Sequence, residues 1–346
     1  MNYLKIHDLH PYHAKFYAGI PQYFISKYAK KKDVIFDPFC GCGTTLMETN
    51  IAGYHSVGVD INFLSAKISS AKVFSAKYQF VRNFTDKILN SVNDTPIQFT
   101  DSEFWFTKNN FRELCCIYNA IQKIDDTDYK NIFEVAISSV LNRVCNKRST
   151  WNLGYLSDNI LPNLESKLSI KKEFQKKCEW LIAAYKEKEE VANYSSVYCS
   201  NIKEFDFNEQ FNLIITSPPY PFAVDFARNN RLSYYLFNED LDAAAQQETG
   251  ARYKRNKKNC EDSFFAEMQE IYTRLMQLVC FGGYICMTVG DTKRKNRAIL
   301  FTDWLINFFN EQNWIIVEDN MRQLQRQSMG QKRIPEEHVL VLQKCA

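Results

Sequence analysis

The sequence has 346 residues, of which 45% are hydrophobic, 14% aromatic and 24% charged, and its formal net charge is only +3. This composition is that of a globular protein with one large domain or two ordinary ones. No apolar run approaches the roughly 18–20 residues of a membrane-spanning helix, and the first residues lack the apolar segment of a secretory signal, so we expect no membrane contact. Because the net charge is small, affinity for nucleic acid would have to come from local basic clusters.

The numbers of cysteine, histidine and glycine residues indicate the redox environment, the absence of a metal site and the positions of special backbone turns. The 11 cysteines are odd in number and form no Cys-x-x-Cys pair, which predicts reduced thiols and a cytoplasmic protein. Five histidines, three of them within the first 13 residues, leave little material for a metal site, and we expect none. Glycine is scarce, and a scarce glycine is expected where the backbone requires it. Five of the 11 glycines fall in two short segments: Gly41, Gly43, Gly282, Gly283 and Gly290.

The N-terminal part of the chain predicts an alternation of strands and helices. Residues 19–30 indicate a short helix, with Pro21 near its start. A buried strand over residues 33–38 runs into a glycine-bearing turn, a helix follows over 44–52, and a second strand covers 56–60. Such a strand–turn–helix–strand unit implies a parallel sheet covered by helices.

The rest of the chain extends the sheet around an insertion. Residues 65–195 carry apolar side chains at helical spacing, which predicts a helical lobe. A further helix is expected at about 299–311. The remaining predicted strands cover residues 196–199, 211–216, 284–289, 314–319 and 339–343. The expected fold is therefore α/β, a doubly wound and mostly parallel sheet formed by residues 1–64 and 196–346, with the helical insertion between them.

The turn after the first strand has the composition of a ligand-binding loop. It reads Asp-Pro-Phe-Cys-Gly-Cys-Gly-Thr-Thr over residues 37–45, and Asp60 follows at the end of the second strand. The glycines let the backbone approach a ligand, and Asp60 is placed to accept hydrogen bonds from two ribose hydroxyls. A phosphate-binding P-loop needs a lysine after its second glycine, and a dinucleotide fingerprint needs a third glycine where Leu46 stands. The segment fits neither of these patterns.

A second segment, Ser217-Pro218-Pro219-Tyr220, directly follows a predicted buried strand. The two prolines fix the backbone and remove two N–H donors. The Ser217 hydroxyl and the Pro218 carbonyl remain as acceptors beside the flat ring of Tyr220. This combination suits a planar base with an exocyclic amine, whose hydrogens would meet the acceptors while the ring stacks on the base.

Together the two segments resemble motifs I and IV of the S-adenosylmethionine-dependent amino-methyltransferases that act on DNA. Ser-Pro-Pro-Tyr is the form typical of the N4-cytosine enzymes, whereas the N6-adenine enzymes more often carry Asp-Pro-Pro-Tyr or Asn-Pro-Pro-Tyr. Residues 10–16, 284–291 and 337–341 are similar to other segments of bacterial members. The insertion matches only loosely. Motif I precedes motif IV, unlike the commonest order of the N4-cytosine enzymes, which leaves the target base open.

The resemblance implies a Rossmann-like class I methyltransferase fold, S-adenosylmethionine as the cofactor and double-stranded DNA as the partner. It further implies a role in restriction–modification, with a cognate endonuclease as a candidate partner, and makes residues 65–195 a candidate target-recognition lobe. Its catalytic residues would be Ser217, Pro218, Pro219 and Tyr220. Its cofactor-binding residues would be Asp37, Phe39, Cys40, Gly41, Gly43, Thr44, Thr45, Asp60, Ile61 and Asn201.

The target would be a flipped base, preferably cytosine N4, with adenine N6 as the alternative. Methylation of guanine N2 in tRNA is a third interpretation, because those enzymes have a similar first motif; they usually carry Asn-Pro-Pro-Tyr. Two basic clusters follow the motifs and are expected to grip phosphates. They consist of Arg252, Lys254, Arg255, Lys257 and Lys258, and of Lys293, Arg294 and Arg297.

Overall fold

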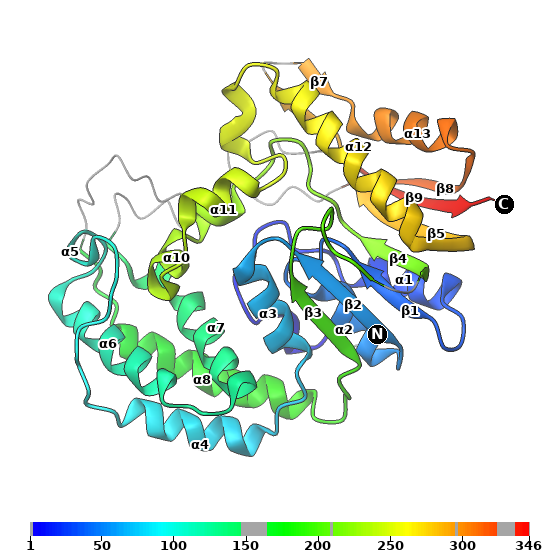
Figure 1. Ribbon diagram of the computed structural model, residues 1–346. Helices are drawn as coiled ribbons and strands as arrows, with labels where there is room; N and C mark the ends of the chain where they lie inside the picture. The colour runs from blue at the N-terminus through cyan, green and yellow to red at the C-terminus, as the bar shows by residue number, and fades with distance from the viewer. Residues whose placement is uncertain (1–2, 147–164, 208–209, 295–296, 324–335, 346) are drawn as a thin grey trace. The chain divides into compact units, whose positions relative to one another are not determined.

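The computed structural model describes residues 3–146, 165–207, 210–294, 297–323 and 336–345, and the chain divides into two compact units (Figure 1). The helical unit comprises Met1–Tyr12, Ser70–Asn193 and Phe226–Gln246. The sheet unit comprises His13–Ser69, Tyr194–Asp225 and Gln247–Ala346.

The sheet unit is built on seven strands in the order β3-β2-β1-β4-β5-β9-β8. The first five pair in parallel, whereas β9 runs antiparallel to both β5 and β8. The strands are β1 (Val34–Asp37), β2 (His55–Asp60), β3 (Ser195–Cys199), β4 (Phe211–Thr216), β5 (Val279–Val289), β8 (Trp314–Gln323) and β9 (Glu336–Lys344). This topology confirms the expected doubly wound, mostly parallel sheet.

Successive strand residues point to opposite faces of this sheet, and the strands carry apolar side chains on both. Helices therefore cover both faces. On one face, Ile35 and Leu213 pack with the apolar residues of α1 (Gly19–Tyr28). On the other, Phe36 and Ile214 share a core with residues of two later helices, α12 (Cys260–Leu278) and α13 (Phe301–Glu311). The remaining helices of this unit are α2 (Thr44–Ile51), the start of α3 (Phe63–Val73) and the short η2 (Arg252–Asn256).

The last three strands are longer than the sequence indicates. β5 begins at Val279 rather than at residue 284, so Gly282 and Gly283 lie inside it. Gly282 has φ +72°, and the β4–β5 register shifts between Phe211 and Leu213, as expected where glycine permits a bulge. A short hairpin of β6 (Thr292–Arg294) and β7 (Arg297–Ile299) forms a second, two-stranded sheet that the sequence does not predict.

The helical unit contains the helices expected for the insertion, and α8 packs against α4, α6 and α7. It also contains Met1–Tyr12 and Phe226–Gln246, which the sequence pattern assigns to the sheet. Buried polar contacts join these segments, since His10 Nε2 lies 3.0 Å from Ser138 Oγ, which lies 2.7 Å from Ser233 Oγ. Its helices are η1 (Lys5–Asp8), the end of α3, α4 (Tyr78–Leu89), α5 (Ser102–Trp105), α6 (Lys108–Gln122), α7 (Thr127–Val144), α8 (Ile170–Glu187), α9 (Phe226–Asn229), α10 (Arg231–Phe237) and α11 (Leu241–Gln247).

All eleven cysteines are free thiols, and most are buried. Within the described ranges, no helix is long and apolar enough to cross a membrane. The same part of the chain contains no group of His, Cys, Asp or Glu side chains that could hold a metal ion.

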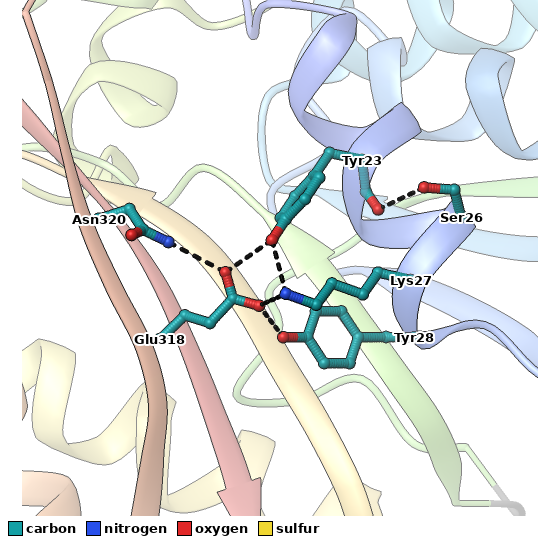
Figure 2. Close-up of polar contacts among 6 residues, drawn as sticks. All are labelled: Tyr23, Ser26, Lys27, Tyr28, Glu318 and Asn320. Atoms are coloured by element: carbon teal, nitrogen blue, oxygen red, sulfur yellow. Dashed lines mark hydrogen bonds and ion pairs between the residues drawn. The ribbon is translucent and has the colours of Figure 1, made fainter.

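Helix α1 is fastened to β8 through the carboxylate of Glu318 (Figure 2). Glu318 Oε2 accepts a hydrogen bond from the Tyr23 hydroxyl at 2.8 Å, while Oε1 accepts from Lys27 Nζ at 2.5 Å and from the Tyr28 hydroxyl. Burial acts to raise the pKa of Glu318, but the hydrogen bonds from Lys27, Tyr28 and Tyr23 outweigh it and hold this pKa below its ordinary value.

Replacing Glu318 with alanine should lower the free energy of unfolding by roughly 1–3 kcal/mol, because several donors lose one acceptor. Since the folded-state pKa lies below the ordinary value, the stabilisation is present above that ordinary value and is lost as the pH falls through the folded-state pKa. Thermal unfolding between about pH 3 and pH 7 measures both effects. Glu311→Ala, at an exposed site on α13, is the control, and an equal loss in the two variants would contradict the prediction.

Candidate cofactor and catalytic site

The glycine turn between β1 and α2 has a backbone that only glycine adopts readily. Gly41 and Gly43 have φ values of +51° and +72°. The Ser69 hydroxyl of α3 donates to the Gly41 carbonyl at 2.7 Å, and the Cys40 amide donates to the Val59 carbonyl of β2 at 3.0 Å. The turn is therefore held from two sides, and Ser69 is a supporting residue that the sequence pattern does not indicate.

Two carboxylates flank this turn at the carboxyl ends of adjacent strands. Asp37, which is 2% exposed, accepts from the Thr216 hydroxyl at 2.6 Å and from the Phe39 amide at 3.2 Å. Asp60 uses one oxygen for the Gly41 amide at 2.9 Å and the other for the Asn62 amide at 2.8 Å. Burial raises the pKa of each carboxyl to about 6, against the opposing effect of these hydrogen bonds.

This arrangement fits a cationic cofactor with a ribose. Among the described residues, no lysine or arginine forms an ion pair with Asp37 or Asp60. Two negative charges without a basic partner, of which Asp37 is buried and Asp60 half-buried, favour a positively charged ligand. Asp60 already accepts two backbone amides, and each of its oxygens retains a second lone pair for a ribose hydroxyl.

The other expected cofactor residues occupy different environments around the turn. Phe39 is half-buried, and Ile61 and Asn201 are partly exposed after β2 and β3. Thr45 is fully buried, and its hydroxyl points to the Ile215 carbonyl at 3.5 Å and to Asp37 rather than outward. Thr44 and Cys40 are also buried, at 2% and 4% exposure. These three side chains support the turn from within.

The Ser-Pro-Pro-Tyr segment lies at the end of β4, next to β1. Ile35 and Phe36 of β1 pair with Leu213 and Ile214 of β4. The chain runs outward from β1 through β2 to β3 and then returns to β4 on the other side of β1, so this is the point where the strand order reverses. Ligands of doubly wound sheets bind at such a point, outside the carboxyl ends of the strands.

Within the segment, Ser217, Pro219 and Tyr220 are partly exposed, and Pro218 is buried. The bond from Thr216 to Asp37 links the catalytic segment directly to the cofactor turn. Burial raises the pKa of Tyr220, and the nearby Glu337 charge raises it further, so the phenol stays protonated. It donates to Glu337 Oε1 of β9 at 3.0 Å.

Hydrogen bonds from backbone amides join the first basic cluster to the loop that follows the Ser-Pro-Pro-Tyr segment. The Phe222 amide donates to the Gly250 carbonyl at 2.8 Å, and the Arg252 amide donates to the Val224 carbonyl at 3.1 Å. The Tyr253 amide donates to Asp225 Oδ1 at 2.8 Å. Of the cluster itself, Arg255, Lys257 and Lys258 are exposed, while Arg252 and Lys254 are half-buried.

The second basic cluster binds Glu261, at the start of α12. Arg294 and Arg297 bind the two carboxylate oxygens of Glu261 at 2.8 Å and 2.6 Å. The pKa of this carboxyl is lowered, and the hydrogen bond from Arg294 is the largest cause. Lys293 is exposed. Thr292 also donates to the Pro221 carbonyl at 2.8 Å. Both clusters are thus tied to the end of the catalytic segment, although Glu261 offsets part of the second cluster's charge.

Replacing Gly43 with alanine should weaken cofactor binding about tenfold or more, because the added Cβ would lie 2.9 Å from Ser69 Oγ and 3.0 Å from Ser69 Cα. Gly53→Ala is a matched control, since Gly53 has φ +77° and an added Cβ meets nothing within 4 Å. Both variants should lose about 1 kcal/mol of stability to backbone strain. Titration calorimetry with S-adenosylmethionine separates them, and equal affinities would contradict the assigned turn.

The parallel sheet with its reversed strand β9, the glycine turn and the acid ending β2 together form a Rossmann-like α/β fold with a candidate cofactor site. Residues 2–70 match the model of the N6/N4 DNA methylase family. The match covers the glycine turn and the acid that ends β2, so this part of the chain is similar to the DNA methylases of that family.

Two curated relatives are type II methyltransferases. M.MvaI of Kocuria varians is 28% identical over 267 residues, which cover 68% of this chain and 58% of that protein. M.MjaII of Methanocaldococcus jannaschii is 31% identical over 99 residues, covering 29% of this chain and 19% of that protein. The chain therefore spans less than two thirds of either relative. Among solved structures, TehB of Haemophilus influenzae aligns over 96% of this chain and 63% of that chain, with 9% identity and a TM-score of 0.40.

Proposed function

We propose that this protein transfers a methyl group from S-adenosylmethionine to the exocyclic amine of a base flipped out of duplex DNA, with cytosine N4 as the preferred target. The observation that carries this proposal is the position of Ser217–Tyr220 at the end of β4, bonded through Thr216 to Asp37 of the neighbouring cofactor strand. Acceptors and a flat ring thereby stand beside the cofactor turn, where a methyl donor and a base would have to meet.

Each residue has a separate task in this mechanism. When bound, S-adenosylmethionine supplies an electrophilic methyl group on a positively charged sulfur. Asp37 would hold the ammonium of the cofactor and Asp60 its ribose hydroxyls. The Ser217 hydroxyl and the Pro218 carbonyl would accept the two amine hydrogens, which localises the nitrogen lone pair and stabilises the charge that develops on nitrogen. Tyr220 would stack on the flipped base.

The basic clusters would hold the DNA backbone beside this site. The backbone hydrogen bonds that join Gly250, Arg252 and Tyr253 to the loop after Tyr220 support this assignment. Arg255, Lys257, Lys258 and Lys293 are exposed and available to phosphates. Such contacts position DNA without specifying its sequence, and binding through them should weaken steeply with salt.

Sequence recognition is assigned to the helical insertion, residues 65–195. All of the proposed cofactor, catalytic and phosphate-binding residues lie in the sheet unit, so the helical insertion has no other proposed task and is the candidate for base reading. Photocrosslinking of a specific duplex to the insertion would test this role. Because both curated relatives are type II methyltransferases, we further propose that the protein acts in the cytoplasm in restriction–modification, paired with a cognate endonuclease.

The direct test is transfer of labelled methyl from S-adenosylmethionine to duplex DNA or to tRNA, followed by mass analysis of the digested nucleosides. N4-methylcytosine is the expected product. N6-methyladenine would support the alternative target instead, and label in guanine of tRNA alone would move the substrate class to RNA. Absence of label from DNA would overturn the proposal.

A further inference from the structure

The tyrosine of the catalytic segment is held through its hydroxyl by a pair of charged residues on the last two strands. The Tyr220 hydroxyl donates to Glu337 Oε1 at 3.0 Å, across 117 residues of sequence. Thr288 of β5 and Ser217 also contact this hydroxyl. The phenol is therefore fixed at its far end as well as through its backbone.

Glu337 is in turn fixed by Arg322. Nε and one terminal nitrogen of Arg322 lie 3.0 Å and 2.9 Å from Glu337 Oε2, so each carboxylate oxygen serves a different neighbour. The two residues face each other in the β8–β9 register, and their side chains are 32% and 14% exposed. The guanidinium also lies over the ring of Tyr17, with 5.6 Å between its carbon and the ring centroid.

We infer that Glu337, held by Arg322, is a positioning residue that sets the orientation of the Tyr220 ring for stacking on the flipped base. This inference rests on the proposed function. Anchoring the phenol oxygen fixes the direction of the side chain, and because a phenolic O–H prefers to lie in the plane of its ring, a strong bond to Glu337 also favours one rotation of the ring about its long axis. The ring then presents a face in the orientation the base needs before the base arrives, which lowers the cost of aligning the amine with the methyl donor.

The experiment compares Tyr220→Phe, Glu337→Ala and their double variant for methyl transfer to duplex DNA under saturating cofactor. Each single variant should lose roughly tenfold in kcat, because the ring remains but its orientation is no longer fixed. The double variant should be no worse than Glu337→Ala, since both changes break one contact. The affinity for S-adenosylmethionine should stay at the wild-type value.

The matched control is Asp319→Ala. Asp319 binds His338 at 2.7 Å across the same two strands, so its loss also removes a charged cross-strand contact, but one that does not involve Tyr220. It should leave kcat unchanged. A fluorescent 2-aminopurine at the target position adds a second readout, because stacking on a fixed ring quenches it and stacking on a mobile ring quenches it less.

The outcomes distinguish this inference from the proposed function. If the wild type methylates DNA and both single variants match its kcat and quenching, Glu337 has no positioning role and the inference is overturned, while the proposed function stands. If the losses in kcat multiply in the double variant, Glu337 does not act through Tyr220. If Asp319→Ala loses as much kcat as Glu337→Ala, the effect is a general one of the two strands. In either case Glu337 is a structural residue, and the inference is overturned. If the wild type transfers no methyl to DNA, the proposed function fails and the inference fails with it.

Discussion

Replacement of Ser217 with alanine is expected to lower methyl transfer about 10²–10³-fold, with little change in the affinity for S-adenosylmethionine. The hydroxyl is one of two acceptors that remain at the end of β4 once Pro218 and Pro219 have removed their own amide donors. Its hydrogen bond to the amine strengthens as positive charge develops on nitrogen, so its loss acts on the transition state more than on ligand binding. Single-turnover transfer of labelled methyl to DNA measures the effect.

A conservative variant distinguishes the acceptor from its surroundings. Ser217→Asn retains an acceptor oxygen and matches the residue found at this place in many N6-adenine enzymes, so it should retain more transfer than the alanine variant. Ser26→Ala, at an exposed position on helix α1, removes a serine hydroxyl that bonds the Tyr23 carbonyl at 2.8 Å and should leave the rate unaltered. Wild-type transfer by Ser217→Ala would show that another group holds the amine.

The sequence predicts the cofactor turn and the catalytic segment because both are marked by local composition. Each follows a run of apolar residues that must be buried, and each contains residues, glycine or proline, whose backbone behaviour is unambiguous. The mostly parallel sheet follows from the same runs, since a strand–helix–strand alternation with buried strands admits few arrangements. The candidate ligand-binding residues at the carboxyl edge can therefore be predicted from the sequence.

The residues that hold these two segments in place through hydrogen bonds cannot be predicted from local composition. Thr216 reaches Asp37 across 179 residues, and Glu337 reaches Tyr220 across 117, in contacts set by strand pairing and by the β8–β9 register. Ser69 belongs to a helix whose composition gives no sign of the turn it holds. The same reason explains why Met1–Tyr12 joins the helical unit, since the contact of His10 with Ser138 depends on tertiary packing.

The second large effect is expected at Asp37, where a substitution should weaken cofactor binding and yet preserve or raise stability. Asp37→Asn should weaken binding of S-adenosylmethionine roughly 10–100-fold at pH 8, because the cofactor's ammonium loses its buried counter-charge. The asparagine retains the oxygen that accepts from Thr216 and Phe39, so the local hydrogen bonds can persist. Calorimetric titration gives the affinity, and thermal unfolding gives the stability.

The pH dependence follows from the raised pKa. The folded-state pKa of Asp37 is about 6, above the ordinary carboxyl value, so its contribution to stability is fully present below the ordinary value and is lost as the pH rises through about 6. The asparagine of the variant stays neutral throughout, so Asp37→Asn should match or exceed the wild type in free energy of unfolding above pH 6. Wild-type affinity for the cationic cofactor should rise between about pH 5 and pH 7, and the rise should be smaller in the variant, where only Asp60 of the two carboxyls still titrates.

Asp60→Asn is the matched comparison, because burial raises the pKa of this carboxyl to about 6 as well. Asp60, however, uses both oxygens for the amides of Gly41 and Asn62, and an asparagine has only one oxygen to offer. Asp60→Asn should therefore lose stability as well as affinity, since one amide is left without its acceptor. A loss of stability in Asp37→Asn equal to that in Asp60→Asn would mean that Asp37 is structural. Retained stability, with a lower affinity that depends less on pH than that of the wild type, would identify it as the counter-charge of the cofactor.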